Sequence, residues 1–127
     1  MHRSAQPIAL LVVAPPGVEH DDVFDGLRGR PDLRLVYATT LDEVDEALRE
    51  ERISVVIASP ELPTASVSAL LDRTAGRREE LPTLVVRSRQ AEEPSGWGQR
   101  GVGVLRCPLL PEALGRSVDV VLGREPA

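Results

Sequence analysis

Hydrophobic and polar positions form two patterns that follow each other along the chain. Short apolar runs predict strands, and between them apolar residues recur every three to four positions, as in amphipathic helices. The first, third and fourth runs are continuous, which is typical of strands buried on both faces, whereas the second alternates and the fifth is short. The predicted strands cover residues 8–13, 33–37, 53–58, 84–86 and 102–105.

The segments between these strands predict helices. The first covers 18–28 and carries acidic residues in its opening turn, where the helix dipole favours them. The second begins at Thr40, which forms a capping box with Glu43, and the third covers about 66–75. The last is opened by Pro111 and continues its apolar face toward the C-terminus.

Strands that alternate with helices indicate parallel pairing with right-handed crossovers. The continuous runs belong in the centre of the sheet, and the alternating second strand and the short fifth strand belong at its edges. The prediction is a single α/β domain over 1–127, with a core at about 7–123. Its fold is a doubly wound, flavodoxin-like sheet of five strands in the order 2-1-3-4-5.

Three local patterns give the chain a resemblance to the response-regulator receiver domain over essentially its whole length. These are the run LLVV that ends the first strand, Ser59-x-x-x-Pro63 after the third, and Cys107-Pro108 after the fifth. In that family two acids after the first strand hold Mg²⁺, and the phosphoaccepting Asp follows the third strand. A Thr or Ser closes the fourth strand, and a Lys follows the fifth. The resemblance implies the (βα)₅ receiver fold.

All five functional positions of that family carry a different residue here. They fall on Ala14, Pro15, Ser59, Arg87 and Cys107, and Ser88 supplies a hydroxyl if the alignment shifts by one residue. Mg²⁺ requires oxygen ligands such as carboxylates, and phosphoryl transfer requires that ion together with a nucleophile. The resemblance therefore implies a degenerate pseudo-receiver, and we expect no enzymatic activity, no cofactor and no bound metal.

The replaced positions leave alternatives open. Arg87, with Glu61 and Ser88 nearby, forms an anion-binding pocket in one interpretation, and in the other it pairs with Glu61 or extends into solvent. Ser59 is either a kinase target or a residue that ends the strand with a turn. Cys107 is either a redox sensor or a small apolar residue that is partly buried.

The interval between the fourth and fifth strands differs from a regular helical segment. It contains Pro94, Ser95 and three glycines, so at most a short helix over 90–93 is expected, and the fourth helix of the receiver pattern is shortened or remodelled. Trp97 in this interval either anchors a contact surface or packs over the sheet edge. The interface predicted here includes Trp97, Arg100 and Arg106.

Composition narrows the choice of partner. The chain has 127 residues with a formal net charge of −5, and all of its basic residues are Arg. An acidic chain with three aromatic residues is unlike a protein that binds nucleic acid directly. The lone Cys fits a reducing compartment, and the apolar run 8–13 is a strand rather than a secretory signal, so we expect a cytoplasmic protein without a membrane span.

These expectations define two functional hypotheses. The first is a phosphorylation-independent pseudo-receiver in a two-component-type system, which regulates a protein partner or an attached output domain and forms a homodimer in one version of the hypothesis. The alternative is a sensor that binds a small anionic ligand near Arg87. An enzyme is disfavoured, because no acid and base pair converges on the predicted strand ends.

Overall fold

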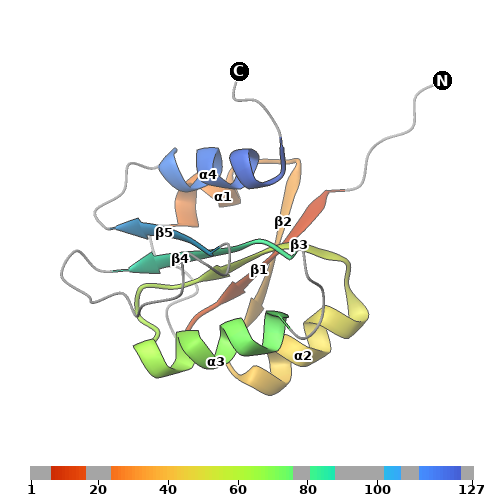
Figure 1. Cartoon of the computed structure of the whole chain (residues 1–127). Helices are drawn as coiled ribbons and strands as arrows, with labels where there is room; N and C mark the ends of the chain where they lie inside the picture. Colours follow the sequence, from red (N-terminus) through yellow and green to blue (C-terminus); the bar gives the residue numbers. More distant parts are fainter. Residues whose placement is uncertain (1–6, 17–23, 76–80, 88–101, 107–111, 124–127) are drawn as a thin grey trace.

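A computed structural model of the chain describes residues 7–16, 24–75, 81–87, 102–106 and 112–123 (Figure 1). Five parallel strands form one sheet in the order β2-β1-β3-β4-β5, so the predicted topology is confirmed. The strands are β1 (Ile8–Val13), β2 (Leu33–Ala38), β3 (Ile53–Ala58), β4 (Thr83–Arg87) and β5 (Val102–Arg106). The helices are α1 (Asp25–Arg28), α2 (Leu41–Glu50), α3 (Thr64–Ala75) and α4 (Ala113–Val121).

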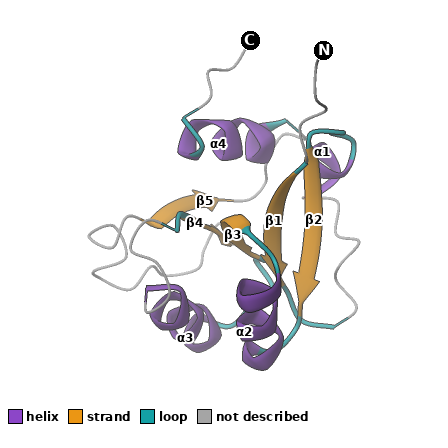
Figure 2. Cartoon of the chain, turned by 90° about the vertical axis from the view of Figure 1, so that its right-hand side faces the viewer, coloured by secondary structure: helices purple, strands orange, loops and turns teal. Residues whose placement is uncertain are grey.

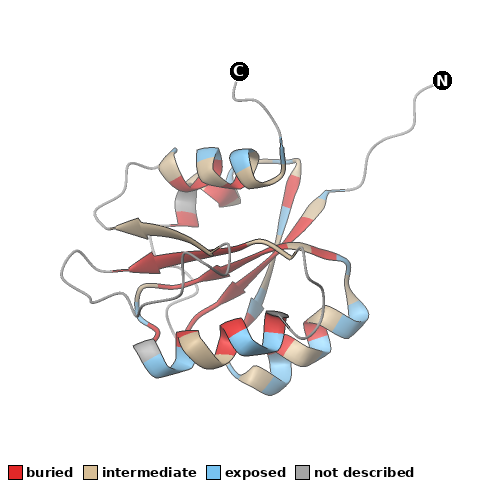
Figure 3. Ribbon diagram, viewed as in Figure 1, coloured by how far each residue is buried: buried red, intermediate tan, exposed pale blue. Residues whose placement is uncertain are grey.

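The helices cover the sheet from both sides. α1 and α4 lie on one face, and α2 and α3 lie on the other (Figure 2). Side chains that alternate along the central strands therefore enter two separate cores. The ribbon of these central strands is coloured mostly as buried (Figure 3). Leu10, Ile57 and Val86 pack with Phe24 and Leu114 on one face, and the other core is formed by Leu11, Val56, Val85, Val67 and Leu70. No helix in the described ranges is long and apolar enough to cross a membrane.

Some element boundaries differ from the sequence prediction. The third helix begins at Thr64, so the predicted start at about Ser66 is wrong by two residues. The reason is that the Pro63 carbonyl already accepts the helical hydrogen bond from the Val67 N–H, at 3.0 Å. β2, β4 and β5 are each extended by one or two residues, and β5 pairs with β4 over its full length, up to Arg87 beside Arg106.

Several predictions fall outside the described residues. They concern most of the first helix before Phe24, the segment 88–101 that contains Ser88, Trp97 and Arg100, and the segment 107–111 that contains Cys107. The remodelled fourth helix of the receiver pattern and the opening of the last helix at Pro111 belong to this group. The described part of the last helix starts at Ala113, with Glu112 at its N-cap.

The predicted capping box at the start of α2 is present in an extended form. The Glu43 N–H donates to the Thr40 hydroxyl oxygen at 3.1 Å. In return the Glu43 carboxylate accepts from the backbone N–H of Thr39 at 2.7 Å and from its hydroxyl at 3.0 Å. These hydrogen bonds to Thr39 lower the pKa of Glu43, because they favour the charged carboxylate. The box orients α2 where the chain leaves β2.

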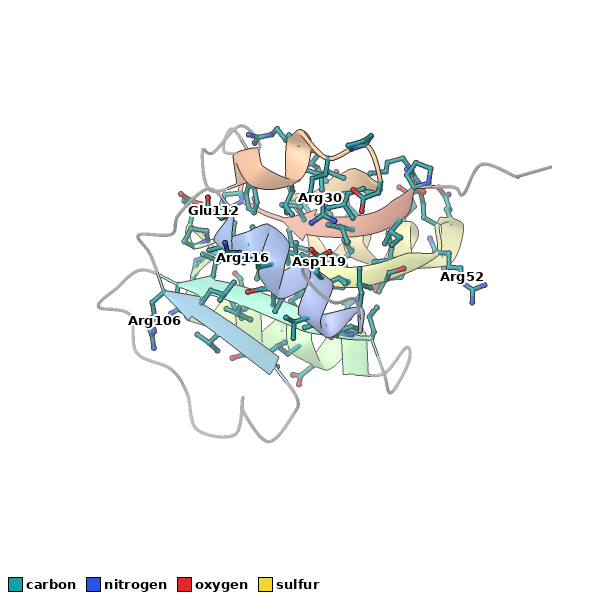
Figure 4. All side chains as sticks on the ribbon, turned by 90° about the horizontal axis from the view of Figure 1, so that it is seen from above. Arg30, Arg52, Arg106, Glu112, Arg116 and Asp119 are labelled. Carbon is teal, nitrogen blue, oxygen red and sulfur yellow. The ribbon has the colours of Figure 1, made fainter. Side chains whose placement is uncertain are left out.

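A charged clamp fixes α4 to the loop between α1 and β2. The Arg30 guanidinium donates to both carboxylate oxygens of Asp32, at 3.1 and 2.8 Å, and to both oxygens of Asp119 on α4, at 3.0 Å each. Figure 4 shows Arg30 and Asp119 pointing toward each other. Gly115 makes room for the guanidinium, because a Cβ there would lie 3.4 Å from Arg30 Nη1. The carboxylates of Asp32 and Asp119 raise the pKa of Arg30.

Replacement of Arg30 by Met should destabilise the fold by about 1–2 kcal/mol, between the values typical of exposed and of buried ion pairs. The side chain is 27% exposed, and its loss leaves two carboxylates facing each other. Urea denaturation measures the change in the free energy of unfolding. The matched control is Arg34→Met, which removes the more exposed ion pair with Glu51 and should lower the free energy of unfolding much less. Equal decreases in the free energy of unfolding for the two variants would contradict a stabilising role for the ion pairs of Arg30.

Candidate functional site

The carboxyl ends of four strands bring the candidate residues to one edge of the sheet. Ala14 follows β1, Ser59 follows β3, and Arg87 and Arg106 end β4 and β5. Two hydrogen bonds continue the sheet past the strand ends, from Ala14 N–H to the Ala38 carbonyl at 3.1 Å and from Ser59 N–H to the Val13 carbonyl at 2.9 Å. Ala14 is buried at this edge, so the position that the receiver resemblance aligns with a metal-binding acid holds a methyl group.

Ser59 is fully buried, with 0% of its surface exposed, and its hydrogen-bonding groups are engaged in a tight turn. Its hydroxyl donates to the Glu61 carboxylate and accepts from the Glu61 backbone N–H at 3.2 Å. Its carbonyl accepts from the Leu62 N–H at 3.1 Å. This is the geometry of a residue that ends a strand with a turn, and it holds the hydroxyl inside the loop.

Arg87 is also buried, with 4% of its surface exposed. The alternative in which this side chain extends into solvent is therefore wrong. Its Nη1 donates to the Leu62 carbonyl at 3.3 Å, which connects the end of β4 to the loop between β3 and α3. The reason for its burial lies in the alternation along β4, because Arg87 shares the sheet face of Val85, which packs against the α2 and α3 layer.

Arg106 lies directly beside Arg87, because the two are register partners at the ends of neighbouring parallel strands. Figure 4 shows the half-buried Arg106 side chain at the end of β5, far from the Arg30–Asp119 clamp. Two neighbouring Arg residues add positive charge to this end of the sheet. The exposed Glu61 carboxylate near the same edge offsets part of that charge.

The described residues offer a weak donor set for a cation. Within them, no group of three or more His, Cys, Asp or Glu side chains is arranged to hold a metal ion. Glu19 and Asp21, the acids of the first helix that the sequence places near this edge, lie outside the described residues. At the described strand ends the chemistry is a buried methyl, a buried hydroxyl and two guanidinium groups, and none of these is a ligand that Mg²⁺ prefers.

One feature of this site has no signal in the sequence. The partner of Arg87 is a main-chain carbonyl that lies 25 positions earlier in the chain, and main-chain acceptors are identical at every residue. The burial of Arg87, in contrast, is indicated by the sequence. Arg87 lies two residues after Val85 and therefore shares its face, and the strand is apolar on both faces.

Comparison with known proteins places the fold. No protein-family model matches the chain, and no curated protein matches its sequence. Solved structures do match: the signal receiver domain of a protein named as a Luxo repressor from Vibrio parahaemolyticus has a TM-score of 0.75 at 16% identity, over 94% of this chain and 92% of that one. A protein named as a response regulator from Chloroflexus aurantiacus has a TM-score of 0.75 at 21% identity, over 94% of this chain and 100% of that one.

The same architecture occurs in proteins with other names. A pilus assembly-related protein from Burkholderia pseudomallei has a TM-score of 0.69 at 18% identity, over 100% of this chain and 98% of that one. Structural similarity at such low sequence identity shows the fold, and the function has to be inferred from the site. The chain therefore has the doubly wound fold of response-regulator receiver domains.

Replacement of Arg87 by Met should destabilise the protein by about 1–3 kcal/mol, because the Leu62 carbonyl loses a charge-assisted donor at a buried position. The control is Arg116→Met, a change of the same chemistry on the exposed side of α4, which should stay within about 0.5 kcal/mol of the parent. Chemical denaturation followed by circular dichroism measures both. A parent-like Arg87→Met variant would show that the contact with Leu62 contributes nothing to the fold.

Proposed function

We propose that this chain is a phosphorylation-independent, receiver-like regulatory module that acts through contacts with a protein partner or an attached output domain in the cytoplasm. The single observation that carries the proposal is the state of Ser59, which stands where receivers have the phosphoaccepting Asp. Its hydroxyl is fully buried and hydrogen-bonded to Glu61 within the turn. A hydroxyl that is buried and held inside the turn is not accessible to a phosphodonor.

The neighbouring positions support the same proposal. Phosphoryl transfer needs positive charge that neutralises the transferred group and holds it in line with the nucleophile, and in receivers a metal ion supplies that charge. Ala14 contributes no ligand, and the Arg87 guanidinium is directed to the Leu62 carbonyl of the adjacent loop. The loop is thus held by hydrogen bonds at Ser59 and at Leu62, which favours one conformation over a phosphorylation-driven switch.

Regulation then has to come from binding. A partner shifts the behaviour of an output domain only if it has different affinities for two states of the assembly, and this requires no covalent change in the module. The contact face predicted from the sequence has three parts: the segment between β4 and β5 with Trp97 and Arg100, β5 with its terminal Arg106, and the last helix. In one version of the proposal, two copies of the chain form a homodimer through this same face.

Incubation with acetyl phosphate and Mg²⁺ should leave the mass of the intact protein unchanged, because no accessible acceptor and no complete metal site is present at the described strand ends. Intact-mass spectrometry is the measurement, and a conventional receiver domain treated in parallel shows that the reagent is active. Stoichiometric gain of one phosphoryl group by the parent protein, lost in Ser59→Ala, would contradict the proposal.

A second candidate function rests on the register of Arg87 and Arg106. Paired guanidinium groups at the carboxyl edge of a doubly wound sheet favour an anionic ligand, and Glu61 and Ser88 belong to the pocket that the sequence predicts there. In this case the module is a sensor for a small phosphate- or carboxylate-bearing molecule.

A titration with inorganic phosphate separates the two candidates, because a ligand that binds the native state raises the melting temperature. The protein-contact module should show no change in melting temperature with phosphate beyond that of an equal ionic strength of chloride. A sensor should show a saturable rise that Arg106→Gln abolishes. Differential scanning fluorimetry is sufficient for the measurement.

A further inference from the structure

A second surface lies at the lateral edge of the sheet opposite β5. It has features that the carboxyl ends of the strands lack. β2 is the edge strand on that side, and in the described part of the chain β1 is its strand partner. A hollow of about 280 Å³ lies between β2 and α2 and is lined by Val36, Tyr37, Glu43, Glu46, Ala47 and Glu50, among others. We call these residues the β2–α2 edge.

The hollow extends over the open side of β2. Val36 and Tyr37 are consecutive residues of one strand, so their side chains point to opposite faces of the sheet, and a hollow that touches both includes the main chain at the edge. Tyr37 is 37% exposed, an unusual position for an aromatic residue in a chain that has three. Arg34, the one charged residue of β2, is paired with Glu51.

The charge beside this hollow is concentrated on α2. The helix carries five acidic residues and one Arg, a formal charge of −4 against −5 for the whole chain. Asp42, Glu46 and Glu50 recur every four residues and form one stripe, and their side chains make no hydrogen bond or ion pair with any residue that the structure describes. Like charges at this spacing repel each other and destabilise the helix.

We propose that the β2–α2 edge binds an extended, basic segment of a partner protein, which adds a strand along β2 and directs Arg or Lys side chains to the carboxylates of α2. An open parallel edge supplies main-chain donors and acceptors for such a strand. The stripe of carboxylates supplies charge complementarity, which increases the rate of association and selects against acidic segments. The alternation of side chains in a strand requires basic residues at every second position.

This inference rests on the proposed function, because it assumes that the chain regulates by protein contact. It adds the chemistry of one partner segment. It depends on no residue of the Arg87 and Ser59 site. The six-residue length of β2 sets the length of the added strand at about six residues.

Fluorescence anisotropy with a labelled six-residue peptide of alternating Arg and Thr tests the proposal. The parent protein should bind it saturably and more weakly as salt rises, and should not bind the peptide in which Gln replaces Arg. Glu46→Gln combined with Glu50→Gln should weaken binding about tenfold. The control combines Asp72→Asn with Glu112→Gln, which removes two charges from α3 and the start of α4 and should leave the affinity unchanged.

Backbone methylation tests the added strand directly. All Arg residues of the peptide that face α2 have their N–H groups on one side, so N-methylation of either the Arg amides or the Thr amides should abolish binding while the other set leaves it intact. The proposal is overturned if both methylated peptides bind as well as their parent, if the control variant is weakened as much as the α2 variant, or if no saturable binding occurs. None of these results affects the proposed function, which fails separately if acetyl phosphate labels the protein.

Discussion

The need to cover both faces of three apolar strands determines most of this structure. β1, β3 and β4 are buried almost throughout, and parallel pairing forces each connection to cross over the sheet. Helices must then lie on both faces, and side chains that alternate along each strand separate into two cores. Polar chemistry is excluded from the middle of the sheet, so it can occur only at strand ends and at the two edges.

That constraint explains why Arg87 behaves as it does. A guanidinium that ends a doubly buried strand has two options, to reach water or to find an acceptor within the protein. Its position on the face of Val85 places it beneath the loop that follows β3, where the Leu62 carbonyl accepts its hydrogen bond. Ser59 in the same loop is engaged with Glu61. Arg87 and Ser59 thus hold this loop in place.

The strands and their order could be predicted from apolar runs, because burial on both faces leaves a continuous pattern in the sequence. Contacts that join distant parts of the chain could not: Arg30 and Asp119 are separated by 89 positions, and no local pattern connects them. Of the alternatives for Arg87, extension into solvent is wrong, because the side chain shares the sheet face of Val85 along β4 and is buried there.

Charges of opposite sign are concentrated in two parts of the molecule, at the carboxyl ends of β4 and β5 and on α2. Arg87 and Arg106 lie in register where β4 and β5 end, and α2 beside β2 carries a formal charge of −4. Asp42, Glu46 and Glu50 repel one another along α2, and this repulsion lowers the stability of the helix. The capping box at Thr40 and the Arg73–Asp45 ion pair offset part of this cost. A helix with this charge pattern gains stability from a cationic neighbour, because a positive charge beside the carboxylates relieves the remaining repulsion.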